Sequence, residues 1–153
     1  MPGAEGRKPV YPPAYVLASC LLMVALHFIA PVRQVVHGAF RLLGLIPMAF
    51  GLAVVLWAAG IFDRAGTAIK PFQESSVLVQ RGPFLVSRNP MYLSMVCALV
   101  GVAVLAGSVS PFLVVPAFAI LIDRRFIRAE EAILERRFGA EYVAYKARVR
   151  RWL

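Results

Sequence analysis

The sequence predicts an all-α integral membrane protein with about four transmembrane helices, the last two forming a helical hairpin, and an amphipathic cytoplasmic helical segment at the C-terminus. Of the 153 residues, 60% are hydrophobic and 16% are charged, whereas an average soluble chain is about half apolar and a quarter charged. Charge-free stretches recur along the chain, with basic residues between and after them. A soluble domain of this length has too little interior to hide so much apolar surface, so we expect lipid to cover the excess.

The first two spans follow from the absence of charge. No Asp, Glu, Lys or Arg occurs in residues 10–32 or 42–62, and a helix needs roughly 20 apolar residues to cross a bilayer. We place the first two helices near 14–30 and 44–62. Pro47 falls in the first turns of the second helix, where its missing N–H is tolerated.

The third charge-free stretch, residues 89–122, is too long for one span. A turn signal, the sequence GSVSP at 107–111, lies in its middle. Basic residues flank the stretch on both sides, and the positive-inside rule places both flanks in the cytoplasm. Two helices near 91–106 and 111–126, joined by a short uncharged turn, satisfy this rule, and a single span does not.

Basic residues also set the orientation. With both termini in the cytoplasm, all 17 Lys and Arg except Arg33 and Arg41 lie on the cytoplasmic side. We expect one domain over residues 1–153 in a bacterial-type inner (plasma) membrane. The apolar run after Arg7 and Lys8 is too long for a cleavable signal peptide.

The tail, residues 127–153, is too charged to span the bilayer, but it has an apolar face at helical spacing and a stop signal at Gly139. The residues of this face are Ile127, Ile133, Leu134, Phe138, Tyr142, Tyr145, Val149 and Trp152. Two arrangements fit. The tail lies on the headgroups as an amphipathic helix, or it folds back over the hairpin and closes a pocket.

The composition also indicates which classes of partner the protein binds. A nucleic-acid-binding module carries its basic face on a soluble domain, whereas here the basic residues border apolar runs and suit anionic headgroups. Cys20 and Cys97 lie singly inside apolar runs, and no cluster of zinc ligands occurs in the sequence. We expect membrane lipid as a partner, and neither nucleic acid nor a metal.

Two polar clusters border the predicted hairpin. The first is the sequence RGPFLVSRNPMY at 81–92, which leads into the third helix, and the second is Glu130-Glu131 after the fourth. If the third and fourth helices form a hairpin, their cytoplasmic ends are neighbours. The fold-back is therefore expected to bring the two clusters together.

In their order, these motifs resemble the isoprenylcysteine carboxyl methyltransferase and phospholipid methyltransferase superfamily. The shared features are Arg-Asn-Pro-Met-Tyr at 88–92, the apolar hairpin, the paired glutamates, and Phe-Gly-Ala-Glu-Tyr at 138–142. The resemblance implies an integral membrane enzyme that binds S-adenosylmethionine at the cytoplasmic ends of the last helices. Where the family pattern commonly has His, this chain has Asn89, which forms hydrogen bonds but cannot become cationic.

A site for S-adenosylmethionine needs acidic groups, aromatic surface and hydrogen-bond donors. We expect Glu130 or Glu131 to bind the ammonium or the ribose hydroxyls, Arg88 the carboxylate, and Tyr92 the adenine or the sulfonium. At Gly82-Pro83 the backbone can approach a cofactor closely. The predicted catalytic residues are Arg88 and Glu130, and the predicted cofactor-binding residues are Gly82, Pro83, Arg88, Asn89, Tyr92, Glu130 and Glu131.

Each of these roles has a simpler structural alternative. Arg81 and Arg88 fit headgroup anchors equally well, and Tyr92 fits an interfacial aromatic residue. Asn89-Pro90 also fits a helix N-terminus, with Asn as the cap and Pro in the first turn. Glu130-Glu131 fits a solvated helix face, but acidic residues in a basic tail beside the membrane favour a functional role.

The sequence thus predicts S-adenosylmethionine-dependent methyl transfer, at the cytoplasmic membrane face, to a lipid-like or small apolar acceptor that enters from lipid. The acceptor is a carboxylate, an amine or a thiol. A carboxylate needs no base, whereas the others must lose a proton and no strong base is evident, which favours the carboxylate. The alternative is a non-catalytic four-helix scaffold or transporter. A transporter is expected to carry an ionisable residue near the midplane, and the spans offer only His27.

Overall fold

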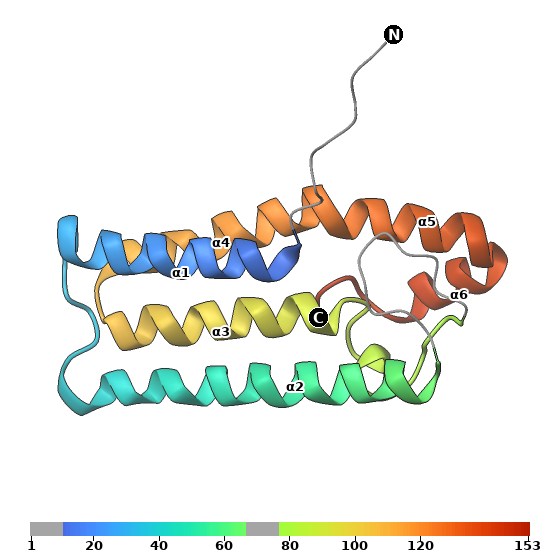
Figure 1. Ribbon diagram of the computed structural model, residues 1–153, viewed down its shortest axis with the longest axis horizontal. Coiled ribbons are helices and arrows are strands. Elements are labelled where there is room, and N and C mark those ends of the chain that lie inside the picture. The colour runs from blue at the N-terminus through green and yellow to red at the C-terminus, as the bar shows by residue number, and fades with distance from the viewer. Residues whose placement is uncertain (1–10, 67–76) are drawn as a thin grey trace, which may run out of the picture.

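The computed structural model describes residues 11–66 and 77–153, and within them every regular element is helical (Figure 1). Four helices lie side by side, each running opposite to the one before it. They are α1 (Pro12–Ile29), α2 (Leu45–Arg64), α3 (Pro90–Ala106) and α4 (Val109–Ile122). Arg7, Lys8 and Lys70, which are among the basic residues used to predict the orientation, lie outside the described residues.

Two helical segments are long and apolar enough to cross a membrane, Pro12–Ile29 and Gly38–Arg64. The second consists of the 3-10 helix η1 (Gly38–Gly44) followed by α2. They match the predicted spans at 14–30 and 44–62. The outward side chains of α1 and α2 are apolar and exposed, among them Leu21, Phe28, Phe50 and Leu56. A surface of this kind suits lipid, whereas four complete spans stay a prediction.

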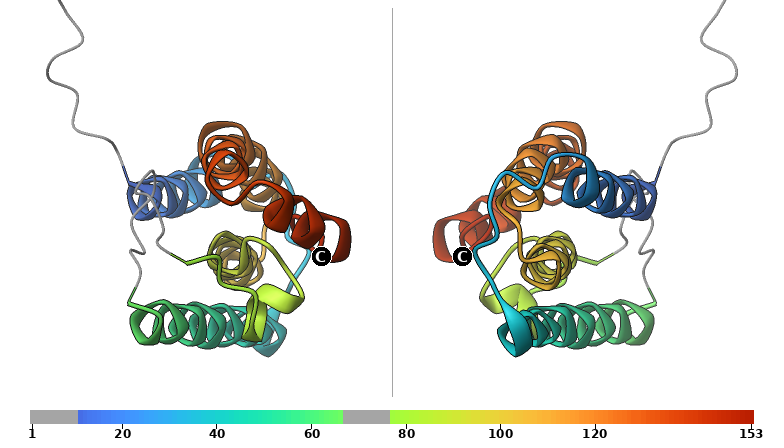
Figure 2. Two further views of the ribbon diagram at one scale, coloured as in Figure 1. Left: turned by 90° about the vertical axis from the view of Figure 1, so that its right-hand side faces the viewer. Right: turned by 90° about the vertical axis from the view of Figure 1, so that its left-hand side faces the viewer.

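The helix α3 lies in the middle of the bundle and packs against α1, α2 and α4 (Figure 2). Its contact with α2 depends on small residues. A Cβ added at Gly51 would lie 2.6 Å from the carbonyl oxygen of Ser94, and a Cβ at Gly101 would meet the carbonyl oxygen of Gly44. Small residues that let backbones approach closely are typical of helix packing within membranes.

The helices α3 and α4 form an antiparallel hairpin. Gly107 ends α3 in the left-handed conformation, with φ of 77°, and α4 begins two residues later. The turn is thus shorter than the predicted GSVSP segment. Arg41 donates from Nε to the carbonyl of Leu105 at 2.7 Å, and from Nη2 to the carbonyl of Ala106. A cation stabilises a helix C-terminus. This contact explains why Arg41, a basic residue, occurs in a connection that is predicted to lie outside the cytoplasm.

The fourth helix does not stop at 126 as predicted. The chain passes from α4 through the π-helical segment η3 (Asp123–Ile127) into α5 (Arg128–Phe138), which extends beyond the bundle (Figure 1). Gly139, with φ of 52°, ends α5 where its stop signal predicted. The last helix, α6 (Ala140–Arg148), turns back toward the start of α3, so the tail folds back over the hairpin.

Candidate functional site

The fold-back brings the two polar clusters into contact at one end of the bundle. In the first turn of α3, Tyr92 donates its hydroxyl to Oε1 of Glu130 on α5, at 2.7 Å. Just before α3, Arg88 donates from Nη2 to Oε1 of Glu131, at 2.9 Å. The segment at 81–92 and the paired glutamates are therefore in contact, as the hairpin topology predicts.

Glu131 lies at the centre of a charge network that is buried at Glu131 and Arg88 and exposed toward Arg128. Its side chain is 9% exposed and that of Arg88 is 10% exposed. A second guanidinium, from Arg151, binds the same carboxylate at 2.6 Å and also binds Asp123 of η3 at 3.0 Å. Arg128 pairs with the other oxygen of Asp123 at 2.9 Å. Hydrogen bonds to these carboxylates raise the pKa of Arg151, and buried charges are tolerated only when they are paired in this way.

Glu130 has a different environment from its neighbour Glu131. Burial raises the pKa of Glu130 to about 7, and the hydrogen bond from Tyr92 offsets part of that rise. Its partner Tyr92 belongs to a group of aromatic rings. The ring centroids of Tyr92 and Phe126 are 6.3 Å apart, and those of Phe126 and Tyr15 are 5.5 Å apart in an edge-on arrangement. The site thus combines an ion-paired carboxylate with a carboxyl that titrates near neutral pH, an arrangement suited to proton transfer.

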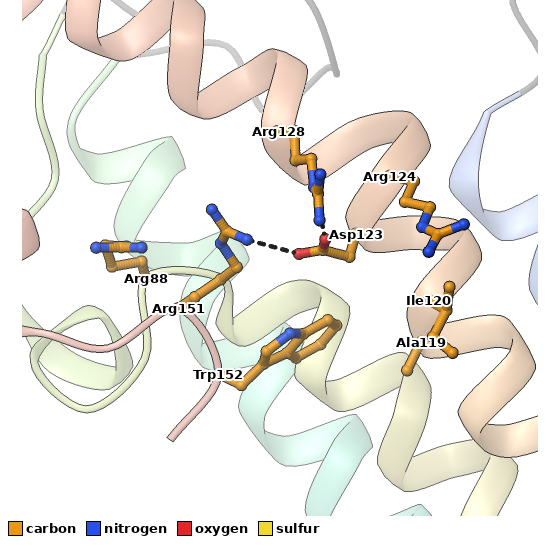
Figure 3. A pocket seen from close by; sticks show the side chains of 8 residues that line it. All are labelled: Arg88, Ala119, Ile120, Asp123, Arg124, Arg128, Arg151 and Trp152. Atoms are coloured by element: carbon orange, nitrogen blue, oxygen red, sulfur yellow. Dashed lines mark hydrogen bonds and ion pairs between the residues drawn. The ribbon is translucent and has the colours of Figure 1, made fainter.

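A cavity of about 520 Å³ opens beside the charge network (Figure 3), and ligand sites commonly measure about 300–1,000 Å³. Its lining residues are Arg88, Ala119, Ile120, Asp123, Arg124, Arg128, Arg151 and Trp152. The Nε of Arg88 is buried and has no hydrogen-bond partner. Unsatisfied buried donors of this kind are rare, and since this atom is shielded from solvent it does not itself face the open cavity.

Gly82 and Pro83 do not line the cavity. They begin the 3-10 helix η2 (Gly82–Leu85), which packs against α2. Gly82 has φ of 60°, and a Cβ there would lie 2.5 Å from Cδ1 of Ile61. Close packing against α2 thus accounts for this glycine without a cofactor, and its predicted role in cofactor binding stays a prediction.

Asn89 occupies the N-cap position of α3, but its side chain does not cap the helix, so that prediction is wrong. Its Nδ2 donates instead to the carbonyl of Arg151, at 3.1 Å. Pro90 stands in the first turn, as predicted. The side chain of Asn89 is therefore used to bind the C-terminal segment.

Of the eight cavity residues, only Arg88 was a predicted site residue, and the missed ones that matter most for a ligand are Asp123, Arg151 and Trp152. A signal for Asp123 exists, because it is the first acidic residue after a long apolar stretch and directly precedes two arginines. Arg151 and Trp152 have no comparable local signal, since their position depends on the return of the tail. No group of three His, Cys, Asp or Glu suited to a metal occurs within residues 11–66 and 77–153.

Comparison with known proteins agrees with these motifs. The phospholipid methyltransferase family matches residues 39–141, which include both polar clusters and the hairpin. An uncharacterized protein of Haemophilus influenzae is 41% identical over 63 residues, which are 41% of this chain and all of that protein. No solved structure matches the chain. The family lies within the membrane methyltransferase superfamily that the motifs resemble, so the resemblance is confirmed. Because the match covers more than half of the sequence, this chain belongs to the phospholipid methyltransferase family.

Proposed function

We propose that this chain transfers a methyl group from S-adenosylmethionine to an amine or thiol on a lipid-like or small apolar acceptor at the cytoplasmic face of a membrane. The family implies a membrane methyltransferase. The observation that carries the cofactor assignment is Arg88, whose largely buried side chain lines the 520 Å³ cavity and is oriented by Glu131. Guanidinium groups pair strongly with carboxylates, and the methionine end of this cofactor carries one.

Two other lining residues, Trp152 and Asp123, suit parts of the cofactor. Trp152 offers aromatic surface for the adenine, and the carboxylate of Asp123 suits the ammonium or the ribose hydroxyls. Glu131 lies behind the cavity and orients Arg88 and Arg151. In this proposal the acidic group that contacts the cofactor is Asp123 rather than either of the paired glutamates.

The cofactor supplies a methyl group that is already activated by the sulfonium. The chain has to align the acceptor with that methyl and exclude water, which requires no nucleophile on the protein. An amine or thiol must also lose a proton, and we assign that role to Glu130, which does not line the cavity itself but is bonded to Tyr92 and has a pKa that burial raises to about 7. This buried carboxyl favours an amine or thiol over the carboxylate acceptor that the sequence alone favoured.

The cavity lies where an acceptor from the membrane can enter. Ile120, at its edge on α4, is apolar and exposed, and Leu121 beside it is exposed as well. Arg124 and Arg128 also border the cavity and are exposed. With four spans and both termini in the cytoplasm, these arginines meet the anionic headgroups of the cytoplasmic leaflet, while the acceptor's apolar part stays in lipid.

The proposed function is tested by measuring cofactor binding and methyl transfer with the purified protein in detergent. S-adenosylhomocysteine is expected to bind saturably in a calorimetric titration. Methyl-labelled S-adenosylmethionine should transfer its label to long-chain amines or thiols and not to long-chain carboxylates. Absence of saturable binding would favour the scaffold alternative, and label on carboxylates alone would overturn the acceptor assignment.

The pH dependence tests the role of Glu130. Because only the deprotonated carboxylate accepts a proton, kcat/KM is expected to rise with pH through about 7, the pKa to which burial raises Glu130. Glu130→Gln should lower kcat/KM about a hundredfold, as expected for loss of a general base, and should remove that rise. A rise that persists unchanged in Glu130→Gln would assign it to the acceptor's own ionisation.

A further inference from the structure

The last residues of the chain are held against the segment that precedes α3. We call residues 149–152 the strap. The backbone N–H of Arg88 donates to the carbonyl of Arg150 at 2.9 Å. The carbonyl of Arg151 accepts two hydrogen bonds, from Nδ2 of Asn89 at 3.1 Å and from Oγ of Ser87 at 3.3 Å. The start of the strap is fixed separately, because Val149 is buried in the cluster around Tyr142 and Tyr145.

The strap forms one wall of the cavity. Figure 3 shows Arg151 and Trp152 on one side of it and Ala119 and Ile120 of α4 on the other. Arg151 reaches from this wall to the carboxylates of Glu131 and Asp123. The position of the strap therefore determines whether Trp152 lines the cavity and whether Arg151 pairs with Glu131.

We propose that Asn89 is a positioning residue of the cofactor site, which acts by holding the strap through its side-chain amide. The cofactor's identity rests on the proposed function, whereas the docking of the strap does not. Asn89 does not line the cavity, so it acts through Arg151 and Trp152 rather than by contact with a ligand. A His ring N–H is also a donor, so His at this position would preserve a donor to the Arg151 carbonyl.

The chemistry of this hydrogen bond explains why a donor is needed. The Arg151 carbonyl is an acceptor, and without Nδ2 of Asn89 it keeps only the longer bond from Ser87. Past Val149 no residue of the strap is fully buried, although Trp152 packs in part against the core cluster, so the lost bond weakens the docking of the strap without abolishing it. Arg151 and Trp152 then leave the cavity for part of the time. Affinity for the cofactor falls in proportion to the docked fraction, while the rate at saturating cofactor is preserved.

Two substitutions at Asn89 separate the loss of the donor from the change of side chain. Asn89→Leu has a similar shape but no donor, and it should weaken binding of S-adenosylhomocysteine about tenfold, the cost of one buried hydrogen bond. It should raise KM for S-adenosylmethionine equally and leave kcat within about twofold. Asn89→His retains a ring N–H and should restore most of the affinity. The matched control is Gln80→Leu, which removes an amide that bonds Glu141 and Arg148 but not the strap.

Docking of the strap is measured without any cofactor. The chain has two tryptophans, Trp57 and Trp152, so a Trp57→Phe background isolates the fluorescence of Trp152. Acrylamide should quench Trp152 more strongly in Asn89→Leu than in Gln80→Leu or Asn89→His. If Asn89→Leu does not fold, Ser87→Ala removes the second donor to the same carbonyl and should change quenching in the same direction.

The two measurements keep this inference apart from the proposed function. Failure of the wild-type protein to bind S-adenosylhomocysteine would overturn the proposed function, and the quenching of Trp152 would still decide whether Asn89 docks the strap. Unchanged quenching in Asn89→Leu overturns the inference. If affinity falls while quenching stays unchanged, Asn89 contacts the ligand directly, which also overturns the positioning role.

Discussion

Replacing Glu131 with glutamine is expected to abolish cofactor binding and to lower the free energy of unfolding by about 3 kcal/mol. The Glu131 carboxylate is 9% exposed and neutralises both Arg88 and Arg151. A neutral amide leaves Arg88 without a carboxylate and leaves Arg151 with Asp123 alone, and removing one partner of a buried ion pair typically costs about 3–5 kcal/mol. Unfolding followed by circular dichroism in detergent gives the stability, and calorimetry with S-adenosylhomocysteine gives the binding.

The matched control is Glu135→Gln, one turn further along α5. Glu135 also forms an ion pair, with Lys146 at 2.8 Å, but the two side chains are 46% and 34% exposed. Exposed pairs of this kind contribute at most about 1 kcal/mol, so Glu135→Gln should change neither property measurably. Equal effects of the two substitutions would show that the buried network is not what holds the site together.

The fold could be predicted because lipid imposes a simple rule on the chain. Helices that cross a hydrocarbon core must be apolar throughout, so the boundaries of α1 and α2 follow from where charge begins. The hairpin of α3 and α4 followed from a different constraint, the basic residues on both sides of one long apolar stretch. The absence of charge and the position of the flanking basic residues can both be seen in a single sequence. The hairpin that they predict brings Tyr92 next to Glu130.

The cavity could not be predicted in the same way, because it depends on contacts that no local pattern encodes. The segment η3 joins α4 to α5 without a break, which directs α5 away from the bundle. Gly139 then reverses the chain, and the hydrogen bond from Tyr145 to the carbonyl of Phe84, at 2.7 Å, fixes the return. The position of Trp152 results from all of these steps together, whereas each step alone leaves it undetermined.

Exchanging Arg88 for lysine is expected to lower kcat/KM at least about a hundredfold, although the charge is kept. Arg88 uses Nη2 for Glu131 and Nη1 for the carbonyl of Lys146, at 2.9 and 3.3 Å, and its Nε is buried. One lysine nitrogen cannot occupy three positions in a plane. Loss of the bond to the Lys146 carbonyl and of one to the cofactor carboxylate, at about 1.5 kcal/mol each for a charged donor, corresponds to roughly a hundredfold in rate. Steady-state assays with methyl-labelled S-adenosylmethionine give the value.

The matched control, Arg81→Lys, distinguishes a binding site from a membrane anchor. From the sequence, Arg81 and Arg88 fit headgroup anchors equally well, and an anchor needs only positive charge near anionic lipid. Arg81 is exposed and precedes η2, so lysine should serve there with little change in activity. Arg88 is 10% exposed, and a side chain so deeply buried reaches no headgroup. If Arg88→Lys is as active as Arg81→Lys, charge alone is sufficient at this position, and the assignment of Arg88 to the cofactor carboxylate is wrong.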